Sequence, residues 1–211
     1  MTLRAHPVSL IRGDLNERFR AARADELRQI RSGRTIKVAK PGATLASPSL
    51  TFAYTLNKSA PSRVTTSERQ PNGSLLVSAQ YINSRGDVIQ TATVAPTSTA
   101  TTPVRTVVNT RYDELGREAA TSQPFAIAGD PVDGIATPTA ASINETRTSY
   151  DALSRPVALE MYGRGVRQWD SSTTYTGNQV TTIPPAGGVS TTVELDMKER
   201  TEKRTDSVKG L

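Results

Sequence analysis

Tyr112-Asp113-Glu114-Leu115-Gly116-Arg117 and Tyr150-Asp151-Ala152-Leu153-Ser154-Arg155 are two copies of one hexapeptide, Tyr-Asp-x-Leu-[Gly/Ser]-Arg. Asp at the first position of a type I turn accepts hydrogen bonds from backbone N–H groups two residues further on. Gly near the end of such a turn adopts a positive φ and forms a G1 bulge, which gives a hairpin loop of about three to five residues. We therefore expect Asp113 and Gly116 to fix a hairpin turn. Tyr112 would pack on the preceding strand, and Arg117 would start the return strand.

Weaker copies extend the repeat along the chain, at Tyr81–Asp87, Leu195–Arg200 and Ser32–Thr35. Ser154 and Glu199 stand where the first hexapeptide has a glycine. Residues other than Gly rarely adopt a positive φ. The turns at these two positions should therefore be strained, or should use a different loop. An internal repeat of this kind indicates a structure built from successive similar units.

Short segments rich in Val, Ile, Thr or Tyr follow one another from residue 35 onward. Each is bounded by Gly, Pro, Asn or Asp, which is typical of a strand. The expected strands are Thr35–Ala39, Ser49–Leu56, Arg63–Glu68, Ser74–Ile82, Asp87–Val94, Pro103–Tyr112, Arg117–Ser122, Thr146–Tyr150, Pro156–Tyr162, Ser172–Tyr175, Gln179–Ile183, Ser190–Leu195 and Arg200–Thr205. Because no helices alternate with them, they predict an antiparallel sheet rather than βαβ units. Residues 95–102 and 129–141 are expected loops, and the second is long enough to be mobile.

The N-terminal stretch contains the one expected helix, over residues 14–32. Asp14 and Glu17 form a capping-box pattern, an imperfect apolar face follows, and Gly33 would end the helix. The weak repeat copy at Ser32–Thr35 competes with this assignment. We expect residues 1–33 to be an N-terminal helical segment and residues 34–211 to form the β-structure, so the fold class is mainly β.

The composition limits both the core and the partners. The chain has 211 residues, of which 36% are hydrophobic and 5% aromatic, so any core should consist of small and β-branched residues. Burial of apolar area stabilises by about 25 cal/mol per Å², and this chain has less of it to bury, so we infer that neighbouring protein helps to stabilise the fold. The net charge is +6, but acidic residues interrupt the basic ones and no aromatic residues alternate with them. A solvated surface is therefore favoured over nucleic-acid binding.

The sequence offers little for catalysis, metal binding or membrane insertion. It has no Cys and a single His, His6, which excludes a thiol nucleophile and a His/Cys zinc site. Nucleotide-binding and nucleophile motifs are absent, so we expect no enzyme activity, no catalytic residue, no cofactor and no metal. No apolar run approaches the roughly 20 residues of a membrane span. No secretory signal is visible, so an exported chain would use another route or belong to a longer protein.

The hexapeptides resemble the YD repeats of Rhs proteins, which also occur in teneurins and in the shell components of Tc toxins. Residues 67–90 and 173–192 resemble the corresponding parts of actinobacterial Rhs proteins, and the resemblance runs from about Arg34 to Arg204. It implies an antiparallel β-strip of YD-type hairpin repeats that winds into a hollow shell, often around a C-terminal toxin. Family members are typically far longer, so this chain would be a partial strip or a truncated relative.

One segment, Gly129–Gly134, superficially resembles the Asp-Pro motif of the family's aspartyl self-cleavage step. It lacks the spacing and the Leu of that motif. We interpret it as part of a loop rather than as a cleavage site.

These observations lead to a main functional hypothesis and an alternative. The resemblance implies a structural, non-catalytic segment of an Rhs-type shell, secreted or at the cell surface, that encloses or presents a toxin or other cargo. Its partners would be further YD repeats in the same or another chain. The repeat-turn residues would be Tyr112, Asp113, Gly116, Arg117, Tyr150, Asp151 and Arg155. Alternatively, Trp169, Tyr162 and Tyr175 would form an exposed aromatic cluster that stacks on cell-surface glycans, although a lone Trp in a β-protein is more often a packing anchor.

Overall fold

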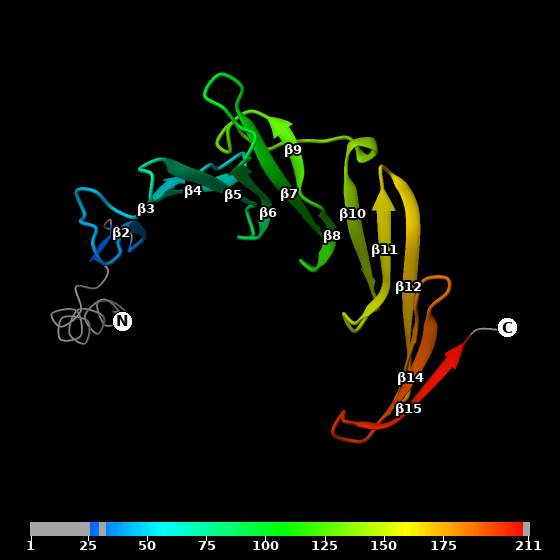
Figure 1. The fold of residues 1–211 in the computed structure, drawn as a ribbon. Helices are drawn as coiled ribbons and strands as arrows, with labels where there is room; N and C mark the ends of the chain where they lie inside the picture. The colour runs from blue at the N-terminus through cyan, green and yellow to red at the C-terminus, as the bar shows by residue number, and fades with distance from the viewer. Residues whose placement is uncertain (1–25, 30–32, 209–211) are drawn as a thin grey trace. The chain divides into compact units, whose positions relative to one another are not determined.

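The structure, a computed structural model, describes residues 26–29 and 33–208. Strands and hairpin turns dominate the described residues, which also include a short 3-10 helix at Ala140–Ser142 (Figure 1). The strands are β1 (Glu26–Gln29), β2 (Thr35–Ala39), β3 (Leu50–Thr55), β4 (Ser62–Arg69), β5 (Leu75–Ile82), β6 (Val88–Val94), β7 (Val104–Tyr112), β8 (Glu118–Ser122), β9 (Phe125–Ala128), β10 (Asn144–Tyr150), β11 (Pro156–Gly163), β12 (Val166–Thr176), β13 (Gln179–Ile183), β14 (Val189–Leu195) and β15 (Thr201–Val208). In this part of the chain no helix is long and apolar enough to cross a membrane. The prediction of a mainly β, antiparallel fold is confirmed.

Every strand expected from the sequence is present, most with bounds within a residue or two of those predicted. β12 is the main exception, because it begins at Val166 rather than Ser172. β9, with the sequence Phe-Ala-Ile-Ala, was not expected.

The expected N-terminal helix is wrong where the structure describes it. Residues Glu26–Gln29 form β1, which pairs antiparallel with β2. Helix propensity is a weak preference, and pairing with a neighbouring strand overrides it here. The remainder of the expected helix, residues 14–25 and 30–32, lies outside the described residues.

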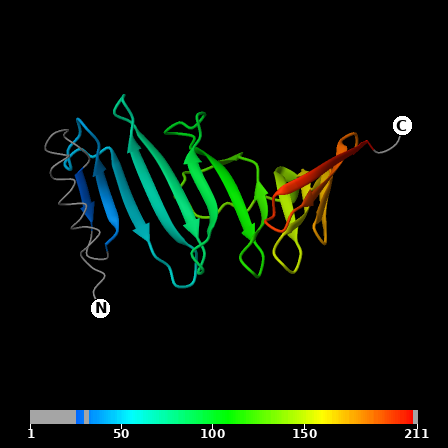
Figure 2. The ribbon, with the colours of Figure 1, turned by 90° about the horizontal axis from the view of Figure 1, so that it is seen from below.

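The chain divides into two compact units. The first comprises Met1–Gly86, Thr91–Arg105 and Ala128–Gly134, and the second comprises Asp87–Gln90, Thr106–Ile127 and Ile135–Leu211. In the first unit β1 to β5 lie side by side in sequence order, and each neighbouring pair is antiparallel (Figure 2). In the second unit the antiparallel order is β7, β8 and then β10 to β15.

A segment without regular structure covers part of the first unit. Pro131 is fully buried, and its carbonyl oxygen accepts a hydrogen bond of 2.9 Å from the Tyr81 hydroxyl. The same hydroxyl oxygen accepts a bond of 2.9 Å from the Gly134 backbone N–H, and Arg105 donates to the Gly134 carbonyl at 2.7 Å. The loop expected over residues 129–141 is therefore present, and hydrogen bonds attach its first half to the sheet of the first unit.

The buried apolar residues are small or β-branched, as the composition predicts, apart from Tyr81. They are Ala39, Ala79, Tyr81, Ala92, Ala95, Val107, Ala120 and Ala136. Between residues 156 and 207 no residue reaches the buried class. The C-terminal strands of the second unit are thus held by their ladder hydrogen bonds and cross-strand side-chain pairs, each of which contributes roughly 0.2–1 kcal/mol, and not by an apolar core.

Candidate functional site

The first repeat loop, Asp113 to Arg117, joins β7 to β8 in the second unit. The Asp113 N–H donates to the Arg117 carbonyl at 2.9 Å, and the Gly116 N–H donates to the Asp113 carbonyl at 3.0 Å. Gly116 has a φ of 82°, and the pairing register shifts between Arg111 and Tyr112. These bonds, the positive φ of Gly116 and the register shift are the features expected of a hairpin loop with a G1 bulge.

The carboxylate of Asp113 organises this loop. Its Oδ1 accepts from the backbone N–H groups of Leu115 at 3.0 Å and Arg117 at 2.9 Å. Its Oδ2 accepts from Nε of Arg117 at 2.7 Å. We call this set of three bonds the Asp clamp. Charge-assisted bonds of this kind are roughly twice as strong as neutral ones.

Two other loops of the second unit, the later copies of the repeat, have the same Asp clamp. Asp151 accepts from the backbone N–H groups of Leu153 and Arg155 at 2.9 Å and from Nε of Arg155 at 2.7 Å. Asp196 accepts the corresponding three bonds at 2.8, 3.0 and 2.8 Å from Lys198 and Arg200. The degraded third copy, which lacks both the Tyr and the Gly, therefore folds as the first does.

The two loops without glycine adopt the strained geometry rather than a different one. Ser154 has a φ of 64° and Glu199 a φ of 59°. Of the two outcomes expected for these turns, the structure shows the first. The Asp clamp evidently offsets a backbone cost of about 1–2 kcal/mol per residue.

Replacing Glu199 with Gly should therefore raise the free energy of unfolding by about 0.5–1 kcal/mol, because Gly removes the strain but adds freedom to the unfolded chain. The matched control is Lys198→Gly, one residue earlier, where φ is negative and Gly should be destabilising. The urea unfolding midpoints of the two variants, compared with that of the parent chain, measure these changes in stability. A loss of stability in Glu199→Gly would contradict the assignment of strain.

Tyrosine side chains connect the first two of these loops to the strand after each of them. The guanidinium of Arg117 lies 4.6 Å from the ring centroid of Tyr150, and the Tyr150 hydroxyl donates to the Glu118 carbonyl at 2.9 Å. Arg155 and Tyr175 repeat this arrangement, at 4.1 Å and with a bond of 3.1 Å to the Pro156 carbonyl. We call the arrangement the Tyr–Arg link. It comprises a ring under the loop arginine and a hydroxyl bonded to the carbonyl of the next residue.

The first unit contains the same link at a degraded copy of the repeat. Arg34 lies 5.4 Å from the Tyr54 centroid, and the Tyr54 hydroxyl donates to the Thr35 carbonyl at 2.8 Å. Tyr112 makes the hydroxyl half of the link, because it donates to the Val88 carbonyl at 3.2 Å. The prediction that Tyr112 packs on the preceding strand is thus consistent with the structure, since Val88 begins β6.

Arg117 also reaches forward to the following loop. Its Nη1 donates to the Asp151 carbonyl and to Oγ of Ser154, both at 3.1 Å. The exposed fraction of the side chain is 22% for Arg117, 41% for Arg155 and 71% for Arg200. The three arginines thus lose contacts progressively along the repeat.

Hydrogen bonds set the charge state of the loop carboxylates. Backbone N–H donation by Arg117 is the largest of the effects that lower the pKa of Asp113, and backbone donation by Arg155 does the same for Asp151. For Asp196 the largest effect is the side-chain bond from Arg200, which also lowers its pKa. Burial, followed by the nearby charges of Glu118 and Asp87, raises the pKa of the Tyr112 hydroxyl.

These pKa shifts predict that the repeat loops lose stability in acid. A carboxylate with a lowered folded-state pKa stabilises the fold above its unfolded value of 3.8 and loses this effect as the pH falls through the folded value. We expect the melting temperature to fall as the pH drops below about 4. The variant Asp113→Asn/Asp151→Asn/Asp196→Asn should show a smaller fall in a melting series from about pH 7 to about pH 2. Parallel curves for the two proteins would contradict the assignment.

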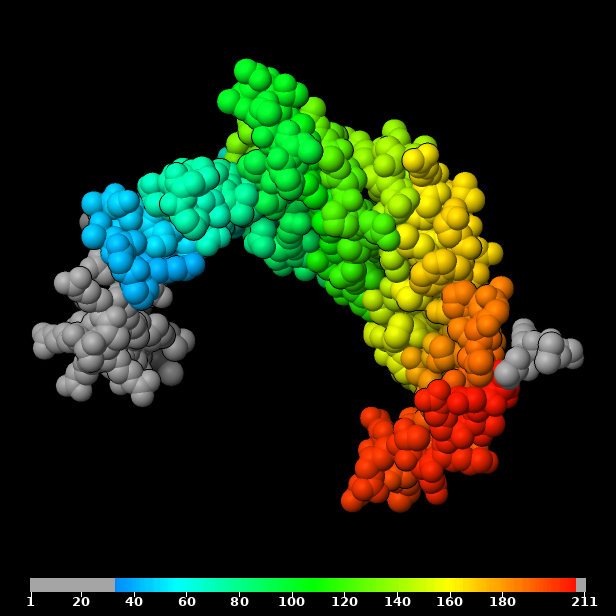
Figure 3. Space-filling model, in the orientation of Figure 1, coloured from blue at the N-terminus to red at the C-terminus, as the bar shows by residue number. Residues whose placement is uncertain are grey.

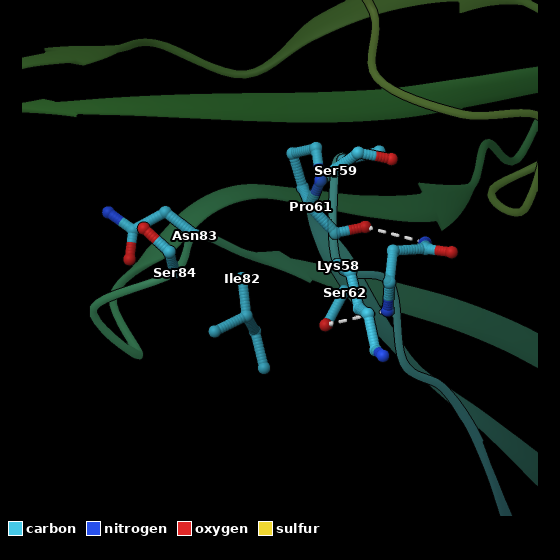
Figure 4. Close-up of a pocket in the computed structure, with 9 residues that line it drawn as sticks. Lys58, Ser59, Pro61, Ser62, Ile82, Asn83 and Ser84 are labelled. Carbon is cyan, nitrogen blue, oxygen red and sulfur yellow. Dashed lines mark hydrogen bonds between the residues drawn. The ribbon is translucent and has the colours of Figure 1, made fainter.

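Two cavities lie near hairpin loops, and neither brings together groups suited to catalysis. One of about 460 Å³, in the second unit, is lined by Arg155, Tyr175, Gly177, Asn178, Gln179, Val180, Leu195, Asp196 and Glu199. Arg155, Tyr175 and Asp196 are already held in the contacts described above. The other, of about 300 Å³ in the first unit, lies between the β3–β4 loop and Ile82–Ser84, and Lys58 is its one ionisable lining residue (Figure 4). The described residues contain no cluster of three potential metal ligands.

The three aromatic residues of the glycan hypothesis do not form one cluster. Met161 pairs with Trp169 and Tyr162 pairs with Arg167, so Trp169 and Tyr162 lie on opposite faces of the sheet. The guanidinium of Arg147 lies 3.8 Å from the centroid of Tyr162. Tyr175 belongs to a Tyr–Arg link, as described above.

One ion-pair cluster, around a buried glutamate, was not predicted from the sequence. Glu145 is 8% exposed and accepts two bonds of 3.1 Å from Arg111 and one of 2.7 Å from Nε of Arg147. The alternation of charges along β10 could have indicated one face of a strand, but the partner Arg111 is far away in the sequence. The cluster uses both carboxylate oxygens in pairing, which suits a structural role.

A comparison with protein-family models found no match, and a comparison with curated proteins found no significantly similar sequence.

Proposed function

We propose that this chain is a structural, non-catalytic segment of a YD-repeat strip of the Rhs type, secreted or at the cell surface, which encloses or presents a toxin or other cargo. Further YD repeats, in the same or another polypeptide, are its partners. The observation that carries the proposal is the recurrence of one loop, with the same Asp clamp in three hairpins and a Tyr–Arg link between a loop and the next strand.

The engagement of the polar side chains supports this proposal. The carboxylates of Asp113 and Asp151 each accept three bonds from backbone and guanidinium donors of their own loops. A general acid or base needs a proton-transfer position open to substrate. These carboxylates instead accept hydrogen bonds that hold their own loops. Such a motif stabilises hairpins, and its repetition stabilises a strip.

The low burial of the C-terminal strands of the second unit also supports the proposal that this chain is one part of a larger assembly. From residue 156 to residue 207 every residue keeps some exposure. An isolated sheet of this kind gains little from the hydrophobic effect. Further repeats or cargo would bury area that this chain leaves open.

We expect the isolated chain to associate or aggregate, because an open sheet presents unpaired edge groups. Size-exclusion chromatography with light scattering, together with far-UV circular dichroism, tests this. A β-rich oligomer supports an incomplete strip. A monomer that melts cooperatively would show that the chain satisfies its own edges, and would overturn the proposal.

A further inference from the structure

β15 is the terminal strand of the second unit, and no described strand pairs with its outer edge (Figure 1). Its residues are coloured red in the space-filling view (Figure 3). Its exposed residues carry charges of both signs, on Glu202, Lys203, Arg204 and Asp206. Charges on an edge strand discourage indiscriminate pairing. Any strand added here must therefore match the edge in chemistry and register.

The register of the Tyr–Arg links follows one rule. In each link the tyrosine lies on the strand that pairs with the return strand of the loop. Extending the observed pairing by three residues places Arg117 directly opposite Tyr150 and Arg155 directly opposite Tyr175. In the first unit the same extension of the β2–β3 pairing places Arg34 opposite Tyr54.

Arg200 is held by its own loop in the same way, but no tyrosine ring of the described residues lies against its guanidinium. Its Nε is held by Asp196 at 2.8 Å, as Arg117 and Arg155 are held by their own Asp clamps. It directly precedes β15, as the other two precede their return strands. Its side chain is 71% exposed, against 22% for Arg117. The difference fits the absence of a ring and of a following loop.

We propose that the outer edge of β15 binds one antiparallel strand, from a polypeptide outside these 211 residues, that ends in tyrosine. The ring lies on the Arg200 guanidinium, the hydroxyl donates to the Thr201 carbonyl, and the residue two before the tyrosine lies opposite Glu202. This deepens and rests on the proposed function, since it names the edge, the partner and the register by which a further repeat is added.

The absence of Cys from the chain allows a clean test by disulfide trapping. The probe is a peptide of residues 170–176, the segment that carries Tyr175, with Thr173→Cys and its thiol activated as a mixed disulfide. It is offered to the full chain carrying either Glu202→Cys or Lys203→Cys. Neighbouring strand residues face opposite sides, so the proposed register favours position 202 by about tenfold in rate.

Two changes remove the recognition and one serves as control. Arg200→Ala in the chain, or Tyr175→Ala in the peptide, should slow trapping at position 202 about tenfold, the effect of losing a cation–π contact and a hydrogen bond together. Lys198→Ala removes a charged side chain from the same loop, keeps the Lys198 backbone N–H that donates to Asp196, and should leave the rate unchanged. Equal rates at positions 202 and 203, or trapping that is unaffected by Tyr175→Ala, would overturn the proposal.

The sizing experiment separates this inference from the proposed function. If the chain associates but trapping is not register-specific, the proposed scaffold function stands and this edge is not its docking site. If trapping is register-specific but the chain is a stable monomer, the edge is a strand-binding site and the proposed scaffold function fails.

Discussion

Replacing Gln90 with Ala is expected to lower the free energy of unfolding by about 3 kcal/mol, the largest effect of any single substitution that we predict. Gln90 is 2% exposed. Its Nε2 donates to the Ala136 carbonyl at 2.9 Å, and its Oε1 accepts from the Ala136 N–H at 2.9 Å. Truncation leaves both backbone groups without partners in a buried site, where each unmade bond costs about 1–3 kcal/mol. Urea unfolding followed by circular dichroism measures the loss.

A second variant separates the hydrogen bonds from the packing. Gln90→Leu keeps about the same volume but cannot pair with Ala136, so it should still cost about 2 kcal/mol. The control is Gln179→Ala, whose exposed side chain makes one bond of 3.3 Å to Glu194 and which should be almost neutral. If Gln90→Leu were as stable as the parent chain, the backbone at Ala136 would not depend on this side chain.

The local geometry of the repeat could be predicted because it is determined within a few residues. Asp113 and Gly116 specify the turn through contacts no more than four residues apart, and that part of the site needs no knowledge of the rest of the chain. The strand positions were predictable for the same reason, since β-branched segments between turn residues signal them locally.

What the sequence did not predict depends on contacts between distant residues. Gln90 looks like an ordinary polar residue of a strand, and only its contact with Ala136, 46 residues later, makes it part of the interior. β1 looks helical in isolation and is a strand because it pairs with β2. Tyr175 was expected to be a glycan contact because it lies near Trp169 and Tyr162 in the sequence, although its register opposite Arg155 makes it part of a Tyr–Arg link.

The repeat also explains why its sequence can degrade while its structure persists. The third loop lacks both the Tyr and the Gly of the hexapeptide, yet it keeps the Asp and the Arg and all three bonds between them. Asp and Arg are therefore the determinants of the loop, and Gly only lowers its backbone strain. The tyrosine acts between strands, so its loss affects the attachment of a neighbour and not the turn itself.

Substituting the three loop arginines by Ala should give a graded series of losses in unfolding free energy. We expect about 2–3 kcal/mol for Arg117, about 1–2 kcal/mol for Arg155 and less than about 0.5 kcal/mol for Arg200. Arg117 loses the clamp bond, the ring of Tyr150 and two bonds to the next loop. Arg155 loses the clamp bond and its ring, and the exposed Arg200 loses the clamp bond alone.

A double-mutant cycle tests whether the link between neighbouring hairpins is the cause of this gradient. Arg117→Ala combined with Tyr150→Leu should destabilise less than the sum of the two single variants, by about 0.5–1 kcal/mol, because each single change already breaks the same cation–π contact. Arg200→Ala combined with Tyr150→Leu is the matched control and should be additive, since no contact joins that pair. Equal losses for all three arginines, together with additivity at Arg117 and Tyr150, would mean that each loop acts only within itself. The graded, coupled result would mean that the hairpins of the second unit stabilise one another through their arginines, and that the stability of each hairpin depends on the strand added after it.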